Sequence, residues 1–176
     1  MKAIGIVLVA TMAACQATTS AGPPQVVEAT SAAVTSFAPF RTFGFSIAAE
    51  PPATYAVSAR SLEVGRRVHE LVVAELLRKG YTEAGPTADF LIRISTGTAK
   101  ADKAEPTTTS GGNENQPQSI TEGEVVVDAF DRSTAQQVWH GSARAEIDPQ
   151  KINEPALQAA MQQMLAPFPA RSAQPR

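Results

Sequence analysis

The sequence has little of several features that usually indicate a function class. Its 176 residues include one cysteine and two histidines, so an internal disulfide is excluded and a metal site built on Cys or His ligands is not favoured. Charged residues make up 18% and the formal net charge is −2, which argues against nucleic-acid binding, because that needs clustered Lys and Arg. No apolar run reaches the roughly 20 residues that a transmembrane helix needs.

Catalytic signatures are also missing from the sequence. It contains no glycine-rich phosphate loop, nucleophile elbow, Cys-x-x-Cys pair or His-Glu-x-x-His pattern. His69 has Val73 rather than a second ligand four residues later, so we expect it to be an ordinary helix residue. The sequence therefore predicts no catalytic residue, no metal and no soluble cofactor, and the protein is not expected to be an enzyme.

The first residues have the order of a secretory signal. Lys2 supplies positive charge, residues 3–12 are apolar, and small residues precede the single cysteine. The segment MAAC at residues 12–15 resembles the lipobox of bacterial lipoproteins. That resemblance implies cleavage between Ala14 and Cys15, and a diacylglyceryl group and an N-acyl chain on Cys15. Residues 1–14 are thus predicted to be a signal peptide.

The resemblance to lipoproteins also implies a location. An aspartate after the lipidated cysteine favours retention in the inner membrane, whereas this chain has Gln16. We therefore expect a lipid-anchored protein on the inner leaflet of the outer membrane, facing the periplasm. Residues 17–36 are small and polar and contain prolines, so residues 15–36 are predicted to be a lipidated N-terminus with a flexible stalk.

Hydrophobic periodicity predicts six elements after the stalk. Phe43, Phe45 and Ile47 alternate with smaller residues, which is typical of a strand. Helices are expected over residues 61–79, ended by Gly80, and after the N-cap Asn153. The other predicted strands cover residues 88–95, 122–130 and 137–147, with a turn at residues 131–136.

The order β-α-β-β-β-α predicts an α+β fold. We expect one domain over residues 37–169, with two helices packed on one face of a four-stranded, mostly antiparallel sheet. Residues 96–119 have no large apolar side chain and are predicted to be a long flexible loop. Residues 170–176 are predicted to be a disordered tail.

Several motifs coincide with these elements. They are the lipobox, FAPFRTFGF at residues 37–45, LLRKGY at 76–81, ADFLIRI at 88–94, and VDAFDRSTAQQVWHGSARA at 127–145. Together they resemble the DUF4136 family, a group of bacterial envelope lipoproteins whose role is unassigned. The most specific element is the acidic turn followed by Val138-Trp139-x-Gly141. The resemblance implies no catalytic residue.

Three functions remain open at this stage. The favoured one is a non-catalytic interaction or structural module of the cell envelope, whose partners are the membrane and another envelope protein. The alternative is a binder of a small apolar or lipid-like ligand, with a cavity lined by Phe90, Ile92 and Trp139. The second alternative is an unrecognised hydrolase with a site at Asp128, Asp131 and His140.

Overall fold

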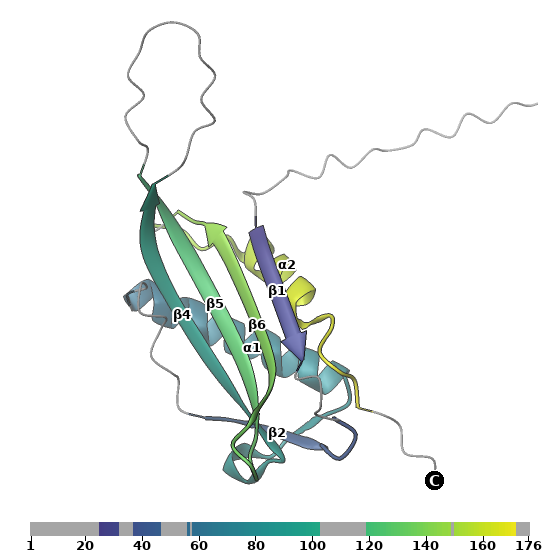
Figure 1. Ribbon diagram of the computed structural model, residues 1–176. Coiled ribbons are helices and arrows are strands. Elements are labelled where there is room, and N and C mark those ends of the chain that lie inside the picture. The colour runs from purple at the N-terminus through teal and green to yellow at the C-terminus, as the bar shows by residue number, and fades with distance from the viewer. Residues whose placement is uncertain are drawn as a thin grey trace, which may run out of the picture.

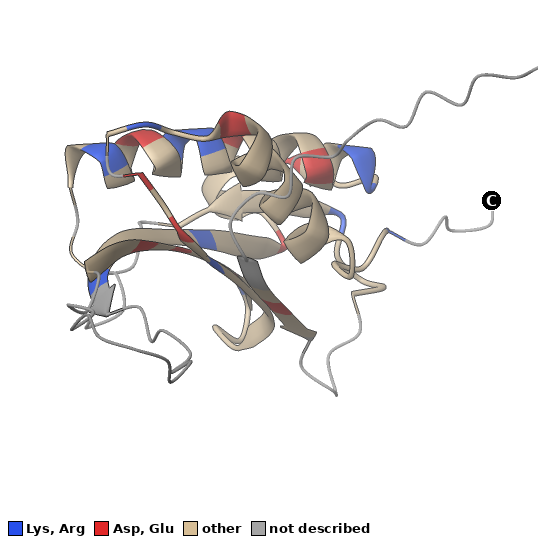
Figure 2. Cartoon of the chain, turned by 90° about the horizontal axis from the view of Figure 1, so that it is seen from above, with Lys and Arg blue, Asp and Glu red and all other residues tan. Residues whose placement is uncertain are grey.

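The computed structural model describes residues 25–31, 37–46, 56, 58–102, 119–148 and 150–171. Its elements are, in order, β1 (Gln25–Ser31), β2 (Thr42–Phe45), α1 (Ala59–Arg78), β3 (Thr82–Glu83), the 3-10 helix η1 (Gly85–Thr87), β4 (Phe90–Asp102), β5 (Ser119–Asp131), β6 (Gln137–Glu146) and α2 (Glu154–Leu165). The strands form one sheet in the order β1-β6-β5-β4-β2-β3. Both α-helices lie behind this sheet in Figure 1 and on the same side of it in Figure 2. The predicted α+β class with two helices on one face is confirmed.

The sheet has six strands, so the prediction of four is wrong. The first additional strand, β1, lies in the segment assigned to the flexible stalk, and it pairs antiparallel with β6 from Gln25↔Ala145 to Ser31↔Trp139. Its side chains Val27 and Ala29 pack against the core. The second, β3, has only two residues and lies parallel to β2. Both are edge strands with few large apolar residues, and so they produce no strong periodicity.

The hairpin of β4 and β5 is longer than predicted. These strands pair without interruption from Phe90↔Asp131 to Asp102↔Ser119, so residues 96–102 and residue 119 belong to the sheet rather than to the predicted loop. Ladder hydrogen bonds join backbone groups and need no large side chain. Residues 103–118 lie outside the described part of the chain, as do the predicted signal peptide, Cys15 and most of the predicted tail.

The sheet is mostly antiparallel, as predicted. Only β2 pairs in parallel, with β4 on one side and β3 on the other. The predicted helix boundaries also hold within two residues. Gly80 follows α1 with a φ of +93°, which glycine adopts without steric cost, and the Asn153 side chain accepts a hydrogen bond from the Ala156 amide at 3.1 Å.

Aromatic side chains concentrate at one end of the layer between sheet and helices. Phe90 is fully buried, and its ring centroid lies 5.2 Å from that of Tyr81 and 6.0 Å from that of Phe168. Trp139, on β6, packs against Phe168 with a centroid separation of 5.0 Å. This end holds the beginnings of β4 and β6 and the carboxyl ends of both helices. None of the described helices is long and apolar enough to cross a membrane.

Candidate functional site

A pocket of about 640 Å³ lies at the other end of the same layer. Its walls are the first turns of α1, the amino-terminal half of α2 and the segment that leads into α2, and its floor is formed by β4, β5 and β6. Apolar side chains of its lining include Val64, Val125, Leu157 and Met161. The pocket is therefore an apolar space covered by both helices.

Small residues on the sheet explain why this space is not filled. Gly123 pairs with Ala145, and Val125 pairs with Ala143, so three of these four floor positions carry a methyl group or no side chain. Side chains alternate along a strand, and these positions lie on the same face as the large aromatic residues at the other end. The sheet thus carries bulky residues under one half of the helices and small residues under the other.

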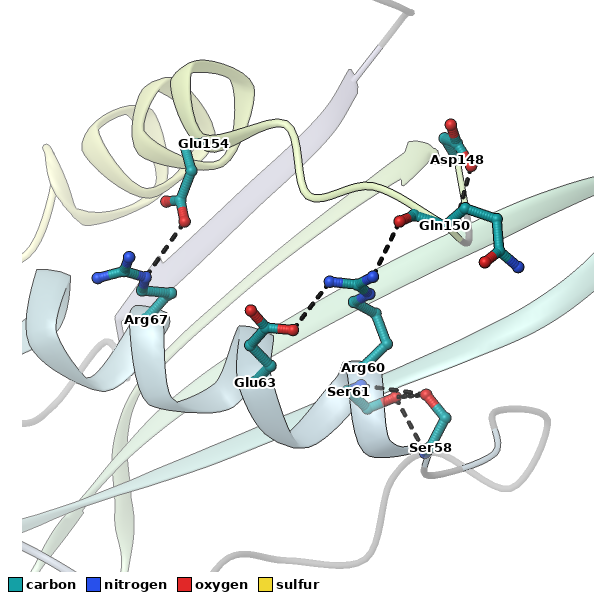
Figure 3. Close-up of polar contacts among 8 residues, drawn as sticks. All are labelled: Ser58, Arg60, Ser61, Glu63, Arg67, Asp148, Gln150 and Glu154. Carbon is teal, nitrogen blue, oxygen red and sulfur yellow. Dashed lines mark hydrogen bonds and ion pairs between the residues drawn. The ribbon is translucent and has the colours of Figure 1, made fainter.

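Two polar bridges join α1 to α2 and the segment that leads into it (Figure 3). The Arg60 guanidinium donates to the Gln150 carbonyl at 2.9 Å and also pairs with Glu63 at 2.8 Å. The Arg67 Nε lies 3.1 Å from a carboxylate oxygen of Glu154. The hydrogen bond that Arg67 donates to Glu70 and the negative charge of Glu154 raise the pKa of Arg67. These contacts are exposed, so each is expected to contribute little to the stability of the fold.

The lining also carries charged groups at the rim. Lys151 is exposed, and its ammonium has no hydrogen bond or ion pair with any described residue. The Asp148 carboxylate accepts a hydrogen bond from the Gln150 amide at 2.8 Å. The rim therefore combines cationic and anionic side chains above an apolar interior, an arrangement that suits an amphiphilic ligand.

The residues predicted to contact a ligand lie elsewhere. Phe90, Ile92 and Trp139 have exposed fractions of 0%, 1% and 1%, and none of them belongs to the pocket lining. They fill the aromatic end of the layer, so they are core residues in the structure. The pocket residues were missed because the sequence reasoning looked for large apolar side chains, whereas the small residues Gly123, Ala143 and Ala145 were the available signal.

The structure brings two of the three hydrolase candidates together. His140 Nδ1 lies 2.7 Å from Asp128 Oδ1. The same oxygen accepts a hydrogen bond from the side-chain amide of Gln137 at 2.7 Å. Asp131 instead caps the turn, where it accepts hydrogen bonds from the Ser133 hydroxyl and amide. The hydrogen bond from the Ser133 hydroxyl and, to a smaller extent, the one from the Ser133 backbone amide lower the pKa of Asp131.

The Asp128–His140 pair lies on the sheet face opposite the helices, because Asp128 alternates along β5 with the core residues Val127 and Ala129. No hydroxyl or thiol among the described residues hydrogen-bonds His140, and the same residues contain no group of three or more His, Cys, Asp or Glu side chains arranged to hold a metal ion. The pair thus has neither a nucleophile in contact nor a metal site.

The sheet face away from the helices is polar at its centre. The Arg144 Nε lies 2.6 Å from Glu124 Oε1, and the Glu124 side chain is only 3% exposed. Its second oxygen has no hydrogen-bond partner among the described residues. Nearer the aromatic end of the sheet, the Arg93 guanidinium stacks 4.4 Å above the ring centroid of Phe130. Charged side chains with exposed ends therefore occupy much of this face.

A family model described as "Domain of unknown function (DUF4136)" matches residues 27–170. This match spans β1 through α2, with every described strand and helix wholly or largely inside it. The chain belongs to the DUF4136 family. The match begins within β1, which supports including that strand in the DUF4136 domain. No curated protein matches the sequence significantly.

Two solved structures resemble this DUF4136 chain at low sequence identity, and the first of them shares its fold. A PDZ domain protein from Parabacteroides distasonis is 16% identical, with a TM-score of 0.55 over 85% of this chain. The chain spans 37% of that protein, little more than a third. A PelC dodecamer from Paraburkholderia phytofirmans is 14% identical, with a TM-score of 0.49 over 84% of this chain and 100% of that one. At these identities the likeness concerns the fold alone.

Proposed function

We propose that this DUF4136 protein is a non-catalytic module of the cell envelope that binds a small apolar or amphiphilic ligand between its helices and its sheet. The observation that carries the proposal is the pocket, whose volume of about 640 Å³ falls within the range of about 300–1,000 Å³ typical of ligand sites. Its mainly apolar lining and few rim charges are also typical of such sites.

A fluorescent apolar probe, 1-N-phenylnaphthylamine, tests this proposal directly. The wild-type protein should bind the probe with a rise in its fluorescence. Val64→Trp should weaken binding at least about tenfold, a loss of about 1.4 kcal/mol, because Val64 lines the pocket and the larger side chain would occupy it. Ile152→Trp, on the opposite wall, should have the same effect and guards against one variant failing to fold.

The matched control is Leu62→Trp, on the same helix two residues away. Leu62 is 67% exposed and lies outside the lining, so this variant should bind the probe like the wild type. Circular dichroism would confirm that all variants are folded. Absence of probe binding by the wild type, or equal binding by folded Val64→Trp and Ile152→Trp, would contradict the proposal.

We also propose that the protein is anchored to the outer membrane, facing the periplasm, by lipid on Cys15. The order of charge, apolar run and small residues before Cys15 supports this. Because β1 begins at Gln25, only residues 16–24 separate the anchor from the sheet. Nine residues span at most about 30 Å. The domain therefore cannot move as far from the lipid surface as a stalk that extends to residue 36 would allow.

Intact-mass analysis of detergent-extracted protein tests the anchor. The wild type should have a mass that corresponds to a chain beginning at Cys15 plus diacylglyceryl and acyl groups, and it should fractionate with the outer membrane. Cys15→Ala should lack these groups. An unmodified, soluble wild-type chain would exclude the anchor without affecting the pocket proposal.

A second candidate function is interaction with another envelope protein. The observation that favours it is the sheet face of β4, β5, β6 and β1 that neither α1 nor α2 covers (Figure 1). Crosslinking in cells should recover a specific partner that is lost with Arg93→Glu on this face and retained with Arg78→Glu on α1. Recovery of the same proteins from both variants would exclude this face as the contact.

A further inference from the structure

We infer that the ligand of the pocket is an amphiphile with one apolar chain and an anionic headgroup, held at the rim between Arg60 and Lys151. This inference rests on the proposed function, since it names the chemical class of ligand for the same pocket. A carboxylate and a phosphate monoester share the required chemistry, so a fatty acid and a lysophospholipid are its two sources.

The size of the pocket favours one chain. If each non-hydrogen atom takes about the volume of a water molecule, about 30 Å³, the pocket of about 640 Å³ holds about 20 such atoms. That number suits a single acyl chain of membrane length with its headgroup at the rim. A phospholipid with two such chains would leave much of its apolar surface in water, which is unfavourable.

The cations at the rim favour a negative headgroup. Lys151 has no partner among the described side chains. Arg60 donates to the neutral carbonyl of Gln150, and a hydrogen bond from a guanidinium to a carboxylate or phosphate is about twice as strong as a neutral one. Arg60 already pairs with the Glu63 carboxylate at 2.8 Å. An anionic headgroup therefore gains chiefly the Lys151 ammonium, and it gives Arg60 a charged acceptor in place of the neutral Gln150 carbonyl.

The two carboxylates at the rim differ in their partners. Glu154 pairs with the Arg67 guanidinium, whereas Asp148 accepts a hydrogen bond from the neutral Gln150 backbone amide and keeps its negative charge. The headgroup is therefore placed against Lys151 and Arg60 and away from Asp148. Glu124 and Glu146 lie on β5 and β6 at positions that alternate with the floor residues Val125 and Ala145. Their side chains are thus on the other face of the sheet, and they contribute no charge inside the pocket.

Competition against bound 1-N-phenylnaphthylamine tests the headgroup. Palmitate and a single-chain lysophosphatidate should displace the probe at concentrations at least about tenfold lower than methyl palmitate and an alkyltrimethylammonium of equal chain length. Whichever of palmitate and lysophosphatidate binds more tightly identifies the source of the headgroup. Inorganic phosphate without a chain should not displace the probe.

Two substitutions test whether the headgroup binds at Lys151 and Arg60. Lys151→Gln and Arg60→Gln should each weaken binding of the anionic amphiphile about fivefold to tenfold and leave methyl palmitate unchanged, because each removes one charge-assisted hydrogen bond to the headgroup at an exposed site. Arg78→Gln is the control: Arg78 lies at the far end of α1, and its side chain is 69% exposed. This variant should bind every competitor like the wild type.

The outcomes separate this inference from the function on which it rests. If Val64→Trp abolishes probe binding but the acid and its methyl ester compete equally, the pocket binds apolar ligands and the anionic headgroup is wrong. The same conclusion follows if Arg78→Gln weakens palmitate as much as Lys151→Gln does. If the wild type binds no probe, the proposed function itself fails.

Discussion

Asp89 connects two strands through a single carboxylate oxygen. Its Oδ2 accepts hydrogen bonds from the Arg41 amide at 2.7 Å, the Thr42 amide at 2.9 Å and the Thr42 hydroxyl at 2.9 Å. Asp89 directly precedes β4, and Thr42 begins β2. The carboxylate therefore fixes the start of the parallel pairing of β2 with β4.

The cost of Asp89→Ala can be estimated from these contacts. A hydrogen bond to a charged group contributes about 1.5–3 kcal/mol. The three bonds share one oxygen and the residues are only half-buried, so water replaces part of what is lost. We expect a decrease of about 2–4 kcal/mol in the free energy of unfolding, a large share of the stability of a domain of this size.

Urea unfolding followed by tryptophan fluorescence measures this loss. Trp139 is the single tryptophan and is 1% exposed, so its emission reports on the core. The control is Asp131→Ala, whose carboxylate bonds only the exposed turn at Ser133 and Thr134, and which should cost about 1 kcal/mol. If Asp89→Ala cost no more than Asp131→Ala, the role assigned to Asp89 would be refuted.

Three further outcomes are expected. Burial acts to raise the pKa of Asp89, but the hydrogen bonds from Arg41 and Thr42 outweigh this effect and lower the pKa. The stabilisation by the Asp89 carboxylate is therefore complete above the unfolded pKa of about 3.9. It is lost as the pH falls through the pKa of the folded state. Urea titrations should show the stability gap between wild type and Asp89→Asn narrowing from pH 6 towards pH 3, and a constant gap would count against this linkage. Gly141→Ala should destabilise by about 1–3 kcal/mol in the same assay, because the added Cβ would overlap the buried Trp139 ring; an unchanged midpoint would mean that the ring can move. Gly65→Ala, within α1, should stabilise by about 0.5–1 kcal/mol, since its Cβ would lie an ordinary 3.5 Å from Thr96; destabilisation would show that the fit is tighter.

The sequence predicted best what is determined locally. Asn153, Gly80 and Asp131 each act on backbone groups within three residues, so the residue type alone indicates the cap or the turn. The buried face of α1, with Val68, Val72 and Leu76, also follows from helical periodicity. The two helices, the hairpin turn and the α+β class were therefore accessible without a structure.

Strands that form only by pairing with distant segments could not be predicted from the sequence. β1 is a strand because it pairs with β6 more than a hundred residues later, and its own small and polar residues resemble those of a linker. Residues 96–102 are strand because β5 pairs with them, although they lack large apolar side chains. In both cases the stabilising partner is the backbone of another strand, which leaves no periodic pattern in the segment itself.

The residues predicted to contact a ligand lie away from the pocket for a related reason. Phe90, Ile92 and Trp139 were chosen because large apolar side chains often line cavities, but the same side chains pack efficiently against one another and fill their end of the layer. A cavity forms where the facing residues are too small to meet, as at Ala143 and Ala145. Such a deficit is visible in a sequence only when the register of the strands and the positions of the helices are known.

The position of β1 relates the pocket to the proposed anchor. Gln25, the first residue of β1, pairs with Ala145, and Ala145 belongs to the pocket lining. The chain therefore enters the sheet at the pocket end, while Ser31 at the other end pairs with Trp139 in the aromatic core. If Cys15 carries lipid, a tether of at most about 30 Å holds the pocket end, rather than the aromatic end, towards the membrane. A ligand with a single acyl chain would then reach the pocket from the lipid surface over a short distance, and loss of the anchor in Cys15→Ala should reduce its occupancy in cells without changing its affinity for the purified protein.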